Sequence, residues 1–79
     1  MNKEELKQFF HKKVLVEYGK IKTSKVGVLI NIPRPEKVSL QFRRTIFDDD
    51  GVPFSFITWK NIDVEKIRRI ALIKNEVIE

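Results

Sequence analysis

Basic and aromatic side chains alternate along the middle of this chain, and together they could hold a polyanion. Arg43 and Arg44 are adjacent in a run of strand-forming residues, and Trp59 lies in the aromatic run that follows. Arginine pairs with phosphate oxygens and an aromatic ring stacks on a nucleobase, so the combination is typical of surfaces that bind single-stranded nucleic acid. The alternative is that both arginines are solvated strand positions and Trp59 packs in the core or at an interface.

Further basic residues lie upstream of this pair. Lys20, Lys22 and Lys25 cluster in and after a polar connection, and Arg34 lies between two prolines. The cluster could contact a phosphate backbone, but a lysine-rich connection also serves solubility, and both interpretations stay open. Residues 1–47 hold 11 Lys and Arg against 4 Glu, whereas residues 48–79 hold 5 against 7 Asp and Glu. The positive charge that favours a polyanionic partner therefore belongs to the first half of the chain.

Residues suited to catalysis are sparse. The chain has no cysteine and one histidine, His11, which excludes a thiol nucleophile, a histidine-dependent triad and a histidine-rich metal site. The run Asp48-Asp49-Asp50-Gly51 begins like a calcium loop, but Pro53 and Trp59 stand where such a loop needs Gly and Glu. We therefore expect no enzymatic activity, no cofactor and no metal, and we interpret the acidic run as a hairpin turn.

The elements that must position these side chains are short strands. Apolar and polar residues alternate in four successive segments, and the Asp-Gly turn between the third and the fourth is a strong hairpin signal. The segments are residues 13–18, 25–32, 37–47 and 52–60. Their alternation predicts antiparallel strands that bury one face.

The second of these segments has a glycine near its middle. Its alternation predicts that Val26, Val28 and Ile30 face the core and that Gly27 and Leu29 face outward. A glycine inside a strand favours a bulge or a sharp bend, which is one way in which a small sheet curves into a barrel. We therefore expect the chain to bend at this position.

The N-terminal residues predict a short helix. Asn2 is a suitable N-cap, because its side chain can accept a hydrogen bond from the first turn. Leu6, Phe9 and Phe10 then share one face of a helix of roughly ten residues. A helix this short is only marginally stable alone, so we expect its apolar face to pack on the sheet.

The segment after the aromatic run allows two interpretations. Asp63 could cap a helix, or residues 63–66 could form a single 3₁₀ turn before a strand over residues 67–73. The apolar residues of this segment do not keep to one helical stripe, which favours the strand. The predicted fold class is then mostly β, with a short N-terminal helix followed by a five-stranded antiparallel barrel. A C-terminal helix would instead give an α+β fold.

Size and composition restrict the setting. The 79 residues predict a single domain that spans residues 1–79. The N-terminal residues do not form a signal peptide, and the apolar run over residues 26–30 is far too short to cross a bilayer. We therefore expect a cytoplasmic protein without a membrane partner.

The order of a helix, four strands, a 3₁₀ turn and a fifth strand resembles the SH3-like small barrels and, within them, the Sm-like proteins. Gly27-Val28-Leu29 is similar to the bent second strand of that family, and residues 36–42 (EKVSLQF) are similar to its third strand. Ser39 stands where the family has an RNA-contacting Asn. Asn61-Ile62 is similar to the junction of the family's fourth and fifth strands, although the Arg-Gly pair of that junction is missing.

The resemblance implies a barrel, a preference for RNA over DNA with Asn61 at the binding surface, and assembly through the last two strands. The leading prediction is a non-catalytic nucleic-acid-binding module. The side chains assigned to nucleic acid are Lys20, Lys22, Lys25, Arg34, Arg43, Arg44, Trp59 and Asn61.

The alternative prediction is a protein-interaction module that forms homo-oligomers through its last two strands. Phe54 and Phe56 share one face of the fourth segment, and Ile57 and Trp59 share the other. Both faces are therefore partly apolar, which predicts a surface that must be covered. The acidic turn and the basic first half could also pair between copies.

Overall fold

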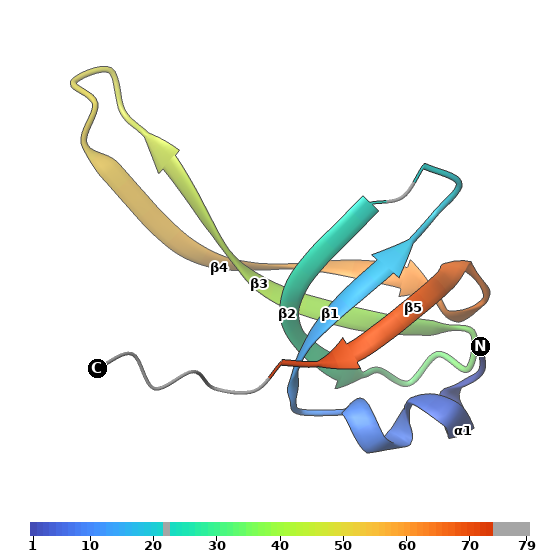
Figure 1. Cartoon of the computed structure of the whole chain (residues 1–79). Helices are drawn as coiled ribbons and strands as arrows, with labels where there is room; N and C mark the ends of the chain where they lie inside the picture. Colours follow the sequence, from blue (N-terminus) through green and yellow to red (C-terminus); the bar gives the residue numbers. More distant parts are fainter. Residues whose placement is uncertain (22, 74–79) are drawn as a thin grey trace.

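The computed structural model describes residues 1–21 and 23–73, which form two short helical turns followed by an antiparallel sheet (Figure 1). Within these residues the sheet has five strands in the order β4-β3-β2-β1-β5, so the predicted mostly β fold with a short N-terminal helix is confirmed. The elements are α1 (Lys3–Leu6), η1 (Lys7–Phe9), β1 (Lys13–Tyr18), β2 (Thr23–Asn31), β3 (Lys37–Phe47), β4 (Pro53–Asp63), η2 (Val64–Lys66) and β5 (Ile67–Leu72).

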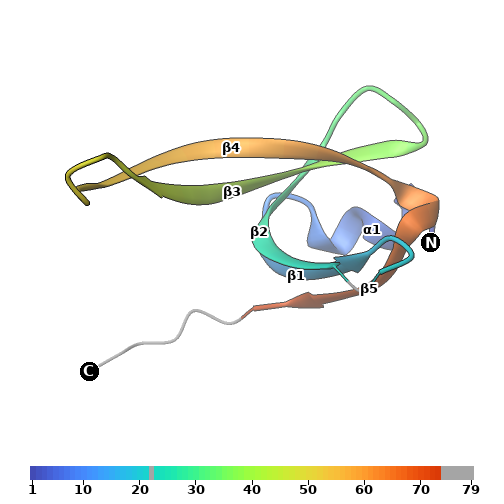
Figure 2. The same ribbon diagram turned by 90° about the horizontal axis from the view of Figure 1, so that it is seen from above.

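The sheet curves strongly, but the predicted closure into a barrel is wrong, because its two edge strands do not pair with each other in the described part of the chain. Figure 2 shows β3 and β4 in one layer and β1 and β5 in the other, with β2 bending from one layer to the other. Strands β4 and β5 are the two edges, and no backbone ladder joins them within residues 1–21 and 23–73. The two edge strands are consecutive along the chain, and the 3₁₀ turn η2 connects the end of β4 to the start of β5.

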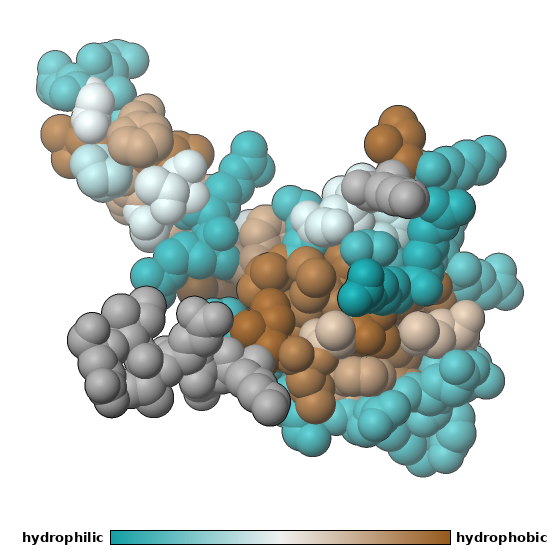
Figure 3. All heavy atoms as spheres, in the orientation of Figure 1, coloured by the Kyte–Doolittle hydropathy of each residue, from teal (hydrophilic) through white to brown (hydrophobic). Residues whose placement is uncertain are grey.

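Strands β3 and β4 extend beyond the rest of the sheet as a two-stranded ribbon, residues 42–58, which we call the arm. Strand β3 pairs with β2 only as far as Gln41, whereas its pairing with β4 continues to Phe47. A hydrogen bond of 3.0 Å between the Thr45 and Ser55 hydroxyls joins the two strands on one side of the ribbon. Figure 3 shows apolar atoms along the arm and hydrophilic atoms at its tip.

The predicted hairpin turn is present at the tip of the arm. The Asp48 carboxylate oxygen Oδ1 accepts hydrogen bonds from the backbone N–H groups of Asp50, at 2.9 Å, and Val52, at 2.8 Å. Gly51 has φ +78°, a left-handed conformation that favours glycine. The side chain of the first acidic residue therefore organises the turn, while Asp49 and Asp50 remain exposed.

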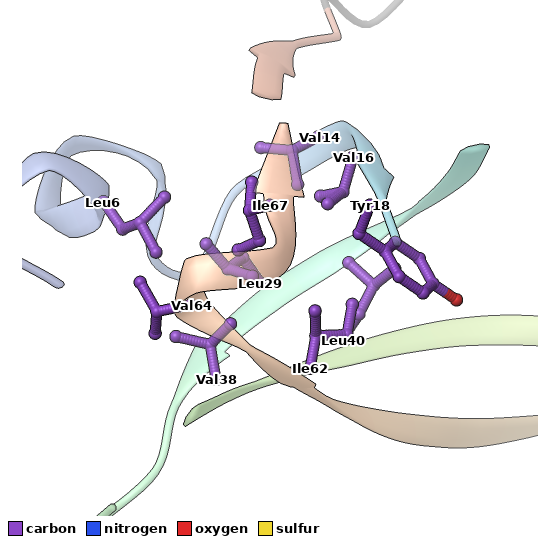
Figure 4. Close-up of a cluster of buried hydrophobic side chains, with 10 residues drawn as sticks. All are labelled: Leu6, Val14, Val16, Tyr18, Leu29, Val38, Leu40, Ile62, Val64 and Ile67. Carbon is purple, nitrogen blue, oxygen red and sulfur yellow. The ribbon is translucent and has the colours of Figure 1, made fainter. Parts of the chain in front are cut away.

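The hydrophobic core lies between the two layers of the curved sheet, and Leu6 from α1 covers one end of it (Figure 4). Phe9 and Phe10 are half-buried at its margin, as predicted. The ten buried apolar side chains found in the described residues are Leu6, Val14, Val16, Tyr18, Leu29, Val38, Leu40, Ile62, Val64 and Ile67.

The N-terminal helix begins where the sequence predicts, but it is shorter. The Asn2 side chain accepts a hydrogen bond of 3.0 Å from the Glu5 N–H, which confirms the predicted cap. The α-helix ends at Leu6 and tightens into the 3₁₀ turn η1, after which His11 has φ +63°. Within residues 1–21 and 23–73, no helix is both long and apolar enough to span a membrane.

The predicted direction of the side chains on β2 is wrong. Gly27 and Leu29 are buried, whereas Val26 is exposed and Val28 and Ile30 are half-buried. A Cβ atom added to Gly27 would overlap the carbonyl oxygen of Gln41 on β3 and lie 3.2 Å from Leu40 Cγ. Glycine is needed here because two backbones approach closely, so this residue faces the interior. The strand bends at this point without a bulge in its pairing with β1 or β3.

The segment after β4 forms the predicted 3₁₀ turn and strand. Residues Val64–Lys66 make one 3₁₀ turn, and Ile67–Leu72 pair with β1, with an irregularity between Glu17 and Tyr18. The alternative α+β fold with a C-terminal helix is therefore wrong for this segment. Strand β5 supplies Ile67 to the core and completes the sheet.

We expect Gly27→Ala to lower the free energy of unfolding by about 1–3 kcal/mol, because the new methyl group must push two paired backbones apart. Urea denaturation followed by circular dichroism measures the change. Ser24→Ala on the same strand is the matched control, because Ser24 is exposed, and its effect is expected within about 0.5 kcal/mol of zero. Equal stability of the Gly27 and Ser24 variants would contradict the close approach.

We expect Tyr18→Phe to keep or raise stability, by up to about 1 kcal/mol. The Tyr18 hydroxyl is buried and has no hydrogen-bond partner among the described residues, so its removal relieves a desolvation penalty. Thermal and urea denaturation of the two proteins test this. A clear loss of stability in the Phe variant would show that the hydroxyl is hydrogen-bonded.

Candidate nucleic-acid interface

An open hollow of about 620 Å³, which we call the root hollow, lies where the arm leaves the sheet. Among the described residues that line it, four carry a positive charge, two are aromatic and none is acidic. They are Lys25 from β2, Phe42, Arg43, Arg44 and Thr45 from β3, and Thr58, Trp59 and Lys60 from β4.

The register of β3 and β4 determines which way these side chains point. Residues directly opposite each other share a face, and Lys60 lies opposite the buried Leu40. Phe42 and Arg44 follow Leu40 at every second position of β3, so they lie on the same face. We call this face, which continues the core, the core-side face. Arg43 and Trp59 lie on the outer face of the ribbon. Because a two-stranded ribbon twists strongly, residues of both faces contribute to one hollow.

Two lysines at the root of the arm lie over aromatic rings. Lys25 Nζ is 4.4 Å from the centroid of the Phe42 ring, and Lys60 Nζ is 5.4 Å from the centroid of the Tyr18 ring. These are cation–π distances, which hold the ammonium groups near the hollow. Within the described part of the chain, none of the four cations of the root hollow forms an ion pair with a carboxylate. A phosphate could therefore bind them without displacing an acidic side chain.

Trp59 is a surface residue. It is 66% exposed and lies opposite Gln41 on the outer face, so the interpretation of Trp59 as a core residue is wrong. The register of the hairpin turns its side chain away from the core, because the core-side positions of β4 at this level are Thr58 and Lys60. An exposed indole beside cations is a platform on which a nucleobase could stack.

The structure brings together four of the residues that the sequence assigned to nucleic acid, Lys25, Arg43, Arg44 and Trp59. It adds Lys60 and Phe42, which sequence reasoning did not assign to the site. Counting outward from the Asp-Gly turn places Lys60 opposite Leu40 and Phe42 opposite Thr58, so the hairpin register was the signal that could have found them.

The other assigned residues lie elsewhere. Lys20 lines a separate hollow of about 340 Å³ with Gly19, Lys66 and Arg68. Arg34 is exposed in the connection between β2 and β3, and it lies outside the root hollow. Asn61 is exposed opposite Ser39 near the end of β4. Lys22 lies outside the described residues.

Asn61 borders a smaller hollow of about 240 Å³ in which an ion-pair network ties three elements together. Lys37 Nζ is 2.7 Å from Asp63 Oδ1, and Lys66 Nζ is 3.4 Å from Asp63 Oδ2. The hydrogen bond from Lys37, followed by that from Lys66, holds the pKa of the Asp63 carboxyl below its ordinary value of 3.8. The network therefore joins the start of β3, the end of β4 and η2.

No family model matches the chain, and no curated protein or solved structure matches it. The chemistry of the site therefore follows from its geometry. Unpaired cations supply attraction for a polyanion, and exposed rings supply stacking for its bases. The root hollow combines both at one place on the sheet.

We expect Asp63→Asn to destabilise the protein at neutral pH and to have little effect in strong acid. Because the pKa of Asp63 is lowered in the folded state, its charged form stabilises the fold above the ordinary pKa of 3.8, and this contribution is lost as the pH falls through the folded-state value. Urea denaturation of both proteins at several pH values between about 2 and 7 measures the difference. A difference that stays constant across this range would contradict the role of the carboxylate.

Proposed function

We propose that this chain is a non-catalytic nucleic-acid-binding module that holds a single strand at the root of the arm. The observation that carries the proposal is the root hollow, where four unpaired cations surround two aromatic side chains in the described residues. Phosphates contact Arg43, Arg44 and the two lysines, and a base stacks on Trp59. Each stacked base contributes about 1–3 kcal/mol in surfaces of this kind.

A single strand fits this site better than a duplex. An indole can stack only on a base whose face is free, and bases of a single strand splay apart without the loss of a base pair. The acidic tip would repel the phosphates of a long duplex laid along the arm. We therefore place the nucleic acid at the root, away from Asp48, Asp49 and Asp50.

The preference for RNA over DNA has separate support, the resemblance to the Sm-like proteins. The root hollow itself does not favour RNA, because phosphate contacts and base stacking are available to single strands of RNA and DNA alike. The RNA preference is therefore tested separately, with matched RNA and DNA strands.

We expect labelled single-stranded oligonucleotides to bind in a salt-dependent way. With three or four phosphate contacts, log K should fall with log salt at a slope of roughly −2 to −3, at about 0.7 per contact. Fluorescence anisotropy at several salt concentrations measures the slope, and the emission of Trp59, the one tryptophan of the chain, reports stacking directly. Binding that is absent at low salt, or indifferent to salt, would rule out the proposal.

We expect the double variant R43E/R44E to weaken this binding at least about tenfold, which is about 1.4 kcal/mol, and to flatten the salt slope. The matched control is R68E/R69E, which makes the same change of charge on exposed residues of β5, outside the root hollow. W59A should also lose about 1–3 kcal/mol of affinity. Equal losses in both arginine pairs would show that the net charge, and not the root hollow, governs binding.

A second candidate function is assembly of several copies through the last strands. The outer edges of β4 and β5 have no strand partner within the described residues, so their backbone groups are open to a neighbouring copy. Addition of β4 of one copy to β5 of the next would form a ring, as the Sm-like resemblance implies. Native mass spectrometry decides this, since a ring of several copies supports edge pairing and its absence argues against it.

A further inference from the structure

We propose that two copies of this chain associate through the core-side faces of their arms. The arms run antiparallel to each other, so the acidic tip of each copy lies over the basic root of the other. The interface is the same patch on both copies and closes as a two-fold dimer. This inference goes beyond nucleic-acid binding and does not depend on it.

The first observation is the apolar surface of the arm. Among the described residues, five of the ten large apolar side chains that are exposed lie in the arm or its turn. On the core-side face, Ile46 and Phe54 are 47% and 59% exposed, and the Phe54 and Phe56 rings lie 5.8 Å apart. This face is the continuation of the one that the body of the sheet buries against its own core.

A two-stranded ribbon is marginally stable in water by itself. The arm has nothing packed on it beyond its root, because β2 leaves β3 at Gln41. An aromatic side chain offers about 150–250 Å² of surface, so the core-side face of one arm offers a few hundred Å². If both arms bury their core-side faces and the charged residues at their ends, the total area buried in the dimer is roughly 1,000 Å². This is about the smallest area that a specific interface buries.

The second observation is the distribution of charge along the arm. The tip carries Asp48, Asp49 and Asp50, and none of them forms an ion pair within the described residues. The core-side face of the root carries Arg44 and Lys60. Arg44 lies three residues before the end of β3 at Phe47, about 10 Å of extended strand, and the acidic turn follows. Antiparallel arms therefore bring each acidic tip to the opposite basic root, whereas parallel arms would place like charges together.

A second copy suits this surface better than a nucleic acid does. Phosphates are attracted to the root but repelled by the tip, so a strand cannot cover the whole arm. Another arm supplies both the apolar stripe and the complementary charges at both ends. Electrostatic pairing of this kind fixes the relative direction of the two ribbons.

Sedimentation equilibrium with charge-swapped variants tests the proposal. We expect the wild type to dimerise, and D49K/D50K and R44E/K60E each to dimerise at least tenfold more weakly, because each variant places like charges at both ends. An equimolar mixture of the two variants should recover the dimer, since the lysine tip then faces the glutamate root and the aspartate tip faces the arginine and lysine of the other root. R68E/R69E matches the charge change of the root variant and should dimerise as the wild type does.

Three results would overturn the proposal: a wild-type monomer at high micromolar concentration, a larger ring, or a mixture that fails to recover the dimer. All the substituted residues are exposed, and circular dichroism of each variant confirms that it is folded. The dimer is measured without nucleic acid, so its presence or absence is independent of the proposed function.

Adding an oligonucleotide to the dimer then tests the two proposals together. If the proposed function is correct, the strand competes with the acidic tip for Arg44 and Lys60 and dissociates the dimer. A dimer that binds no strand would overturn the proposed function alone. A protein that is monomeric before the oligonucleotide is added, and then binds it, would overturn the dimer alone.

Discussion

The close backbone contact between β2 and β3 at Gly27 is the constraint on which the rest of the structure depends. Only a residue without a side chain can lie against the Gln41 carbonyl and Leu40, so β2 can cross from one layer to the other at this point. The crossing ends the pairing of β2 with β3 and leaves β3 paired with β4 alone. The arm, its exposed faces and the hollow at its root all follow from this departure.

The same departure explains why polar and aromatic groups gather at the root of the arm. In the body of the sheet the even-numbered positions of β3 are covered by the core, and Val38 and Leu40 occupy them. One step further along, Phe42 is only half-buried, and Lys25 of β2 covers part of its ring. Beyond that point no further strand packs on the ribbon within the described residues, so the side chains there do not have to fill an interior.

Local signals predicted much of this fold. The Asn2 cap, the turn at Asp48 and the strand after η2 each depend on a few neighbouring residues, and the sequence was sufficient for them. The faces of β2 were mispredicted because Val26, Val28 and Ile30 make the even-numbered positions the more apolar set, whereas the fold buries Gly27 and Leu29. The close approach of Gly27 to Gln41 determines which face of β2 is buried. These two residues are far apart in the sequence, so the residues around Gly27 do not indicate the contact.

The site was predicted only in part for a related reason. Arg43, Arg44 and Trp59 lie on one hairpin, so their proximity follows from the turn. Asn61 lies on the same hairpin, opposite Ser39, but outside the root hollow. Lys20 lies in the connection between β1 and β2, and its distance from the hairpin depends on the curvature of the whole fold. The exposure of Trp59 follows from its place on the outer face, opposite Gln41, and the hairpin register determines that face.

The arm contributes none of the fully buried residues described in the core, and this has a consequence for how its length can change. Removing or adding two residues in each strand would move the tip by about 7 Å and keep every side chain on its face. Removing one residue from each strand would exchange the faces of everything beyond the change. In evolution and in protein engineering, this ribbon can therefore be lengthened or shortened in steps of two residue pairs, while the body that carries it stays the same.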